Sequence, residues 1–167
     1  MLLGLPGAGK TTVGRLVAAA VRAPFVDLDT EIARHAGKPI PVIFQEDGEA
    51  AFRVLESGCA RLAFAREPAV IAAGGGFAED AANRAAAHAA GVTVYLEVAP
   101  ATAAARLGGS GGRPLLDSAD PAARLAVLLE RRLAGYLEAQ HVVATDGTTP
   151  DQVARQVASL AREHGGW

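Results

Sequence analysis

Cysteine, lysine and aromatic residues are all scarce in this sequence of 167 residues. Cys59 is the single cysteine. This excludes an intrachain disulfide and a cysteine-rich metal site and fits a reducing compartment, so we expect a cytoplasmic protein. Lysine occurs only at Lys10 and Lys38, and all the other basic side chains are arginines. Because this bias supplies many arginines, an individual arginine needs support from its neighbours before a function is assigned to it.

The chain also lacks a surplus of charge and a long hydrophobic run. It has 16 basic and 18 acidic residues with no basic cluster, so we expect no nucleic-acid partner. No run of 18 uncharged apolar residues occurs and the amino-terminal segment is rich in glycine, so we expect no membrane association. The hydrophobic fraction of 50% is typical of a globular protein, and we treat residues 1–167 as a single domain.

Short apolar runs alternate with amphipathic segments along the whole chain, which predicts a three-layer α/β/α fold with a parallel sheet of about five strands. Apolar runs without polar alternation are typical of parallel strands covered on both faces. The expected strands are 25–28, 69–72, 92–96 and 141–144, after a stub at 1–3. Either the sheet tolerates so short a first strand or the natural start lies upstream. The expected helices are 10–21, 47–65, 79–90, 100–107, 121–139 and 150–164, with Asp47, Asp120 and Thr149 at N-cap positions.

Residues 4–11 read Gly-Leu-Pro-Gly-Ala-Gly-Lys-Thr and match the phosphate-binding pattern G-x-x-x-x-G-K-[ST] in full. The motif follows a strand stub and opens a helix, where backbone N–H groups and the helix N-terminus can surround phosphate oxygens. Lys10 would reach the β- and γ-phosphates, and the Thr11 hydroxyl would bind Mg²⁺. The candidate nucleotide-binding residues of this loop are Gly7, Ala8, Gly9, Lys10, Thr11 and Thr12.

The position of the second lysine, Lys38, excludes one class of phosphate-loop protein. A GTPase reads guanine with Asn-Lys-x-Asp, but the only lysine after the loop is Lys38, in Gly-Lys-Pro. This excludes a GTPase. A small-molecule kinase, a nucleotide kinase and a nucleotide-dependent regulatory module all remain open at this point.

Asp27 and Asp29 stand at the end of the second expected strand. The period-two geometry of a strand would place both carboxylates on one side, at the carboxyl edge of the sheet where ligands bind in open α/β folds. One carboxylate could organise Mg²⁺ through water while the other accepts a proton from an attacking hydroxyl. The structural alternative is a solvated strand end that caps a helix.

Three further groups lie downstream. Arg53 and Glu56 are three residues apart on an expected helix and can pair, with Phe44 and Phe52 either walling a pocket or packing in the core. Gly74-Gly75-Gly76 follows a buried strand, which indicates a close backbone approach to a ligand or a tight turn. Arg113 lies in a glycine-rich loop that could close over a triphosphate as a lid.

In their order and spacing these motifs resemble the shikimate kinase family over essentially the whole chain. The resemblance rests on the phosphate loop, Asp27-x-Asp29, the triple glycine and Arg132 four residues before Tyr136. It also includes Ile43-Phe44, Asp47-Gly48-Glu49, Phe52-Arg53 and Arg113-Pro114-Leu115-Leu116.

The resemblance implies a monomeric enzyme that uses ATP and Mg²⁺ to convert shikimate to 3-phosphoshikimate, a step towards chorismate and the aromatic amino acids. It implies an acceptor-binding segment at about 29–58 and a lid at about 107–118. Asp29 would act as base, Asp27 would hold Mg²⁺ through water, and Arg113 would bridge substrate and the transferring phosphoryl group. Arg106 and Pro150 would contact adenine. The implied substrate-binding residues are Asp29, Arg53, Gly74, Gly75, Gly76 and Arg132, the two arginines clamping the carboxylate.

Two alternatives stay open. A gluconate-type kinase also has a phosphate loop and acidic residues on its second strand, but the triple glycine and the Arg113–Arg132 pair favour shikimate. A non-catalytic regulatory module would have kept the fold and lost the chemistry. The intact set of Lys10, Thr11, Asp27, Asp29 and Arg113 argues against that alternative.

Overall fold

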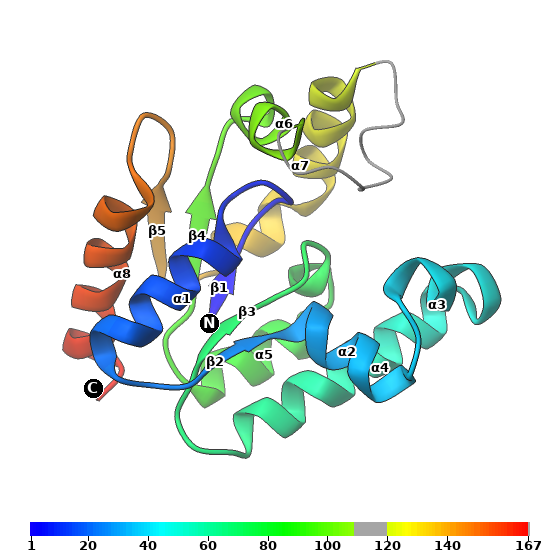
Figure 1. Cartoon of the computed structure of the whole chain (residues 1–167), viewed down its shortest axis with the longest axis horizontal. Coiled ribbons are helices and arrows are strands. Elements are labelled where there is room, and N and C mark those ends of the chain that lie inside the picture. The colour runs from blue at the N-terminus through cyan, green and yellow to red at the C-terminus, as the bar shows by residue number, and fades with distance from the viewer. Residues whose placement is uncertain (109–119, 167) are drawn as a thin grey trace.

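The computed structural model describes residues 1–108 and 120–166. The predicted lid residue Arg113 lies outside the described residues. At the centre is a five-stranded parallel sheet in the order β2-β3-β1-β4-β5 (Figure 1). The strands are β1 (Leu2–Leu3), β2 (Phe25–Asp27), β3 (Val70–Ala72), β4 (Val94–Glu97) and β5 (His141–Ala144).

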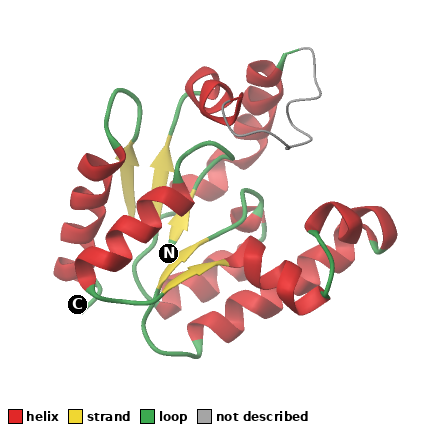
Figure 2. Ribbon diagram, in the orientation of Figure 1, coloured by secondary structure: helices red, strands yellow, loops and turns green. Residues whose placement is uncertain are grey.

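Helices cover both faces of the sheet, so the predicted three-layer α/β/α fold is confirmed (Figure 2). α1 packs against α8 on one face, and α5 lies on the other, while α2, α3 and α4 pack together beside β2. The helices are α1 (Lys10–Val21), α2 (Leu28–Ala36), α3 (Ile40–Glu46), α4 (Gly48–Phe64), α5 (Ala81–Ala90), α6 (Pro100–Gly108), α7 (Pro121–Leu137) and α8 (Pro150–His164), with a 3₁₀ helix, η1 (Phe77–Glu79), before α5.

The two residues of β1 form the central strand. Leu2 pairs with Ala72 of β3 on one side and with Val94 of β4 on the other. Both leucines of β1 are buried, as expected for neighbouring residues of a central strand whose side chains point to opposite, covered faces of the sheet. A strand of two residues is therefore enough here, because its neighbours supply the hydrogen bonds on both edges.

The predicted helices 10–21 and 150–164 and the predicted strand 141–144 have the observed bounds. Two of the three predicted N-caps are also confirmed. The Asp120 carboxylate accepts a hydrogen bond from the Ala123 amide, and Thr149 forms a reciprocal capping box with Gln152. These ends are well predicted because a cap is a contact between residues three positions apart.

The prediction that a strand extends through Asp29 is wrong. β2 ends at Asp27, whose carboxylate accepts a hydrogen bond from the Thr30 amide and caps α2. Asp29 therefore lies in the first turn of a helix, where a negative charge interacts favourably with the helix dipole. The period-two argument for Asp27 and Asp29 fails, although both still line the same cavity.

The other expected elements have bounds that differ from the observed ones by one or two residues, and three of the differences have a clear cause. Asp47 does not cap α4 with its side chain, which instead forms an ion pair with Lys38 at 2.6 Å. β4 begins at Val94 because the Thr93 amide donates to the Gln140 side chain. The helix expected from residue 79 begins at Ala81, after η1, where the Asp80 carboxylate caps it. The helices α2 and α3 were not expected.

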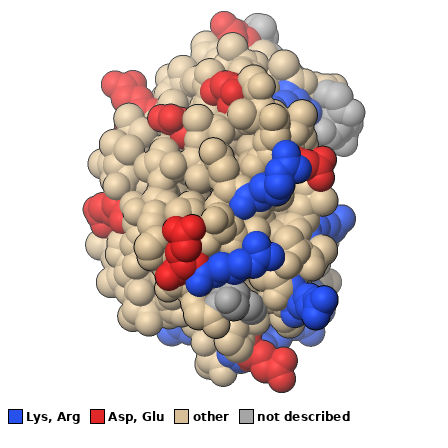
Figure 3. All heavy atoms as spheres, turned by 90° about the vertical axis from the view of Figure 1, so that its left-hand side faces the viewer, with Lys and Arg blue, Asp and Glu red and all other residues tan. Residues whose placement is uncertain are grey.

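Among the described residues, no helix combines the length and the apolar character needed to cross a membrane. The face with α8 and β5, turned to the viewer in Figure 3, carries both acidic and basic side chains.

Candidate active site

A cavity of about 1130 Å³ lies at the carboxyl edge of the sheet. It is bounded by the loop before α1, the start of α2, the segment from α3 into α4, the turn after β3, and α7. Every predicted site residue within the described ranges lines this one cavity: Gly7, Ala8, Gly9, Lys10, Thr11, Thr12, Asp27, Asp29, Arg53, Gly74, Gly75, Gly76, Arg106, Arg132 and Pro150. The structure thus brings the set together, while the role of each residue stays a prediction.

The phosphate loop is shaped by close packing against α6. Gly7 has a φ of 84°, and a Cβ there would lie 2.5 Å from the Ala103 carbonyl oxygen, so only glycine fits. The Lys10 ammonium donates hydrogen bonds to the carbonyl oxygens of Gly4 at 2.8 Å and Leu5 at 2.9 Å. The lysine is therefore held over the loop, next to the N-terminus of α1, where an anion would bind.

Thr11 and Asp27 form the candidate metal site. The Thr11 hydroxyl donates to the Asp27 carboxylate at 2.8 Å, and both residues line the cavity beside Lys10. An alcohol oxygen and a carboxylate are hard oxygen donors of the kind that Mg²⁺ prefers, with water and phosphate oxygens completing its coordination. No cluster of three or more His, Cys, Asp or Glu side chains suited to a metal occurs in the described part of the chain. The donor set therefore fits a metal shared with a nucleotide.

Arg106 spans the loop and the segment after β5. Its guanidinium donates to the Thr145 carbonyl at 2.7 Å and the Thr145 hydroxyl at 3.0 Å, and it approaches the Gly7 carbonyl at 3.5 Å. Pro150 lines the same cavity as Arg106 and Thr145. Arg106 thus ties the two segments that border the expected adenine position.

The triple glycine makes room for charged groups on three sides. A Cβ on Gly74 would lie 2.7 Å from a Glu56 carboxylate oxygen and 2.9 Å from one of Asp29, and a Cβ on Gly75 would lie 3.2 Å from Nη1 of Arg132. A Cβ on Gly76 would lie within 3 Å of the Arg53 guanidinium. The missing side chains therefore let two carboxylates and two guanidinium groups converge on one turn of backbone.

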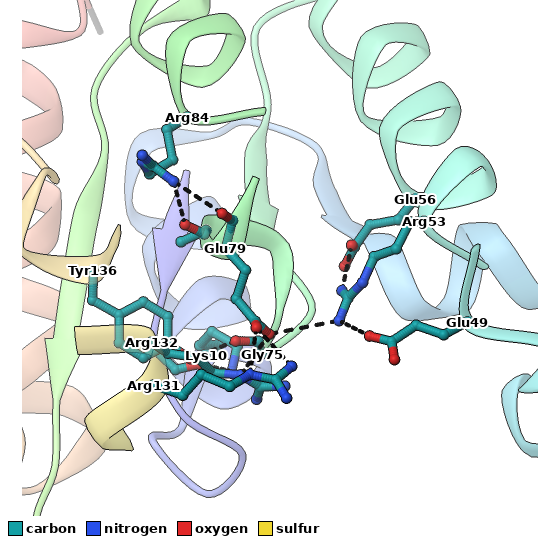
Figure 4. Close-up of polar contacts among 12 residues, drawn as sticks. Lys10, Glu49, Arg53, Glu56, Gly75, Glu79, Arg84, Arg131, Arg132 and Tyr136 are labelled. Carbon is teal, nitrogen blue, oxygen red and sulfur yellow. Dashed lines mark hydrogen bonds and ion pairs between the residues drawn. The ribbon is translucent and has the colours of Figure 1, made fainter. Parts of the chain in front are cut away.

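Arg53 is fixed on α4 by acidic neighbours, as Figure 4 shows. It forms ion pairs with Glu56 at 2.8 Å and Glu49 at 3.0 Å. Glu56 is buried, and burial raises the pKa of its carboxyl, an effect that the hydrogen bond from Arg53 only partly opposes. Phe44 and Phe52 stack with ring centroids 4.5 Å apart and both line the cavity, so they form a pocket wall.

Arg132 extends from α7, and its Nε donates a hydrogen bond to Glu79 at 2.8 Å. One helical turn further, Tyr136 donates its hydroxyl to the Gly75 carbonyl oxygen and so ties α7 to the glycine turn (Figure 4). The Arg132 side chain is only 11% exposed.

Glu79 is the functional candidate that sequence reasoning missed. It follows the triple glycine by three residues, but no spacing rule connects it to arginines far away in the chain. Its position after the glycine turn was the only available signal.

The comparisons with known proteins agree on one family. The family model described as shikimate kinase matches residues 6–162. A shikimate kinase from Thermobifida fusca is 46% identical over 161 residues, which cover 95% of this chain and 91% of that protein. A structure of the Acinetobacter baumannii shikimate kinase in complex with shikimate superposes with a TM-score of 0.89 at 34% identity, covering 97% of this chain and 91% of that one.

A more distant likeness concerns the fold alone. A gluconokinase structure from Sinorhizobium meliloti has a TM-score of 0.63 at 20% identity, covering 99% of this chain and 92% of that one. The gluconate-type alternative is therefore less supported than the shikimate kinase family.

Proposed function

This chain belongs to the shikimate kinase family, and from that premise we propose which residues carry out its reaction. The chain phosphorylates shikimate with ATP, a transfer of a phosphoryl group to a hydroxyl that serves aromatic amino acid biosynthesis. The observation that carries the residue assignment is the convergence of Asp29, Arg53 and Arg132 on the turn at 74–76.

The acceptor binds between the arginines and Asp29. Arg53 and Arg132 clamp the shikimate carboxylate, because a guanidinium pairs with a carboxylate bidentately and stays charged. The glycine backbone at Gly75 contacts the ring, and Phe44 and Phe52 cover its apolar side. This pose points a ring hydroxyl at Asp29, which orients the hydroxyl and accepts its proton as the oxygen attacks.

The nucleotide binds along the phosphate loop. Lys10 turns from the loop carbonyls to the β- and γ-phosphates, the backbone of Gly7–Thr12 surrounds them, and Arg106 and Pro150 border the adenine. Thr11 and, through water, Asp27 would hold Mg²⁺, which would neutralise charge on the phosphate oxygens. Arg113, outside the described residues, supplies a further cation from the lid at about 107–118. Positioning and charge neutralisation therefore account for the transfer.

We also propose a monomer of a single domain, with an acceptor-binding segment at about 29–58 from which Asp29, Phe44 and Arg53 line the cavity. The single cysteine, buried in α4, fits the cytoplasm.

Substitution of Asp29 by Asn tests the assignment. The amide keeps the size of the side chain but cannot accept the proton, so we expect kcat to fall by about 10²- to 10⁴-fold. ATP binding should stay as in the original protein. The assay is ADP release with shikimate, gluconate or no acceptor. If ADP release by the original protein does not depend on shikimate, the assigned substrate is wrong. If Asp29→Asn loses ATP binding as much as it loses activity, the role assigned to Asp29 is wrong.

A further inference from the structure

Glu79 contacts both arginines to which the proposed function assigns the substrate carboxylate, so this inference rests on that assignment. One carboxylate oxygen accepts from Arg132 Nε at 2.8 Å and lies 3.6 Å from Arg53 Nη2. The other oxygen pairs with Arg131 at 2.6 Å. Figure 4 shows Glu79 between the arginine of α4 and those of α7.

The contact reaches Arg132 from the side away from the ligand space. Glu79 takes the Nε position, whereas Nη1 of the same guanidinium points at the turn, 3.2 Å from where a Cβ of Gly75 would be. Arg53 and Arg132 line the cavity, but Glu79 is not among the described residues that line it. Glu79 therefore supports the two cations from behind and does not occupy the place of a substrate carboxylate.

We propose that Glu79 is a positioning residue that holds Arg132 and Arg53 in the orientation that receives the carboxylate of shikimate. Two long arginine side chains lose considerable rotamer freedom when they clamp a ligand. Holding them in place before binding removes part of that loss, so the clamp binds more tightly without a new contact to the substrate.

The support is itself rigid. Arg84 of α5 donates to the carbonyl oxygens of Ala78 at 2.9 Å and Glu79 at 3.2 Å, which fixes the backbone of η1. Arg84 also pairs at 2.6 Å with Glu138, next to the end of α7. Burial alone would raise the pKa of Glu79, but the hydrogen bond from Arg131 and the charge of Arg132 lower it, so the carboxylate stays charged at neutral pH.

A carboxylate beside the clamp also repels an anionic substrate, and this electrostatic effect acts in the opposite direction. The two effects differ in sign, and substitution at Glu79 separates them. Loss of a support weakens shikimate binding, whereas loss of a competing charge strengthens it.

The test compares Glu79→Ala and Glu79→Gln with a matched control, Glu31→Ala. Glu31 also pairs with an arginine, Arg34, at 2.7 Å, and its side chain is 29% exposed against 23% for Glu79, but it lies on α2 away from the active-site cavity.

We expect E79A to raise the KM and Kd for shikimate about tenfold, the size of one charge-assisted contact in a network. The KM for ATP should be unchanged, and kcat should change less than threefold. E79Q, which keeps an oxygen acceptor for Arg132, should raise the shikimate KM by a smaller factor, and E31A should match the original protein.

A substrate analogue sharpens the result. When the carboxylate of shikimate is replaced by a hydroxymethyl group, E79A and the original protein should bind it equally well, because the clamp has no anion to hold. An equal loss with shikimate and with this analogue would overturn the proposal, as would a shikimate KM that falls in E79Q or that stays constant in both variants.

Failure of this inference is distinguishable from failure of the proposed function. Arg132→Ala should raise the shikimate KM more than E79A does. If R132A raises it and E79A does not, the clamp stands and the support role is wrong. If R132A leaves it unchanged, the clamp itself is wrong and the inference falls with it.

Discussion

Alanine at Gly135 tests how closely α7 must approach the turn that forms the site. A Cβ on Gly135 would lie 2.1 Å from the carbonyl oxygen of Ala78 and 3.0 Å from its carbon. Both are backbone atoms of η1, which cannot rotate away as the end of a side chain can. To accept the methyl group, either α7 or η1 has to shift, and these two elements carry Arg132 and Glu79.

The magnitude follows from two opposing effects. Replacing a helical glycine by alanine stabilises a helix by about 1 kcal/mol through propensity. Overpacking against fixed atoms costs about 1–3 kcal/mol, and a backbone contact of 2.1 Å belongs at the upper end. The net loss is about 2 kcal/mol, which for a chain of this length lowers Tm by about 4–8 °C.

Gly58 provides the matched control. It also lies inside a helix, α4, but no atom would lie within 4 Å of its Cβ. Gly58→Ala should therefore keep the propensity gain of about 1 kcal/mol and raise Tm by about 2–4 °C. Thermal unfolding followed by circular dichroism at 222 nm measures both variants under one condition.

The same variant reports on the site. Because a shift of about 1 Å between positioned groups can cost up to about 100-fold in activity, kcat/KM for shikimate should fall in G135A and not in G58A. If G135A melts at or above the temperature of the original protein, α7 and η1 are not packed as closely as described, and the reasoning is refuted.

Two further predictions concern Glu56 and Thr149. Burial raises the pKa of Glu56 above its ordinary value of 4.5, so the folded state binds this proton more tightly than the unfolded chain does. Stability from this group is then present at low pH and is lost as the pH rises above about 4.5. The unfolding free energy of the original protein minus that of Glu56→Gln should therefore fall between pH 4.5 and 7, and a flat difference would count against a raised pKa. Thr149→Ala removes the cap of α8 and should cost about 1 kcal/mol, or a Tm lower by about 2–4 °C, whereas Thr149→Ser should restore it. Equal melting of T149A and T149S would argue against the capping box.

The parts of the fold that sequence alone could predict are those set by neighbours in the chain. The phosphate loop, the start of α1 at Lys10 and the cap at Thr149 each depend on residues within one or two helical turns. The same locality explains one error. Asp27 was assigned to a strand that continued to Asp29, but its carboxylate also accepts from the Thr30 amide, and this short-range contact begins a helix instead.

The parts that could not be predicted depend on contacts across the chain. Glu79 joins Arg53 and Arg132, which are far apart in sequence and meet only because the turn after β3 lies against side chains of α4 and α7. No periodicity connects the three residues. The pocket wall formed by Phe44 and Phe52 was likewise open from sequence, because core packing and ligand contact require the same residue types.

Burial separates functional arginines from the many surface arginines that the composition of this chain supplies. Arg34 and Arg132 each pair with a glutamate at less than 3 Å, yet the Arg34 side chain is 65% exposed and that of Arg132 only 11%. An exposed pair adds little to stability, so Arg34 needs no role beyond its helix. Removing a guanidinium from water costs several kcal/mol unless its partners compensate, so Arg132 contributes little to stability by being inside. Glu79 holds this cation with its Nη1 next to the Gly75 turn. Binding of a substrate carboxylate therefore explains its position better than a contribution to the stability of the fold does.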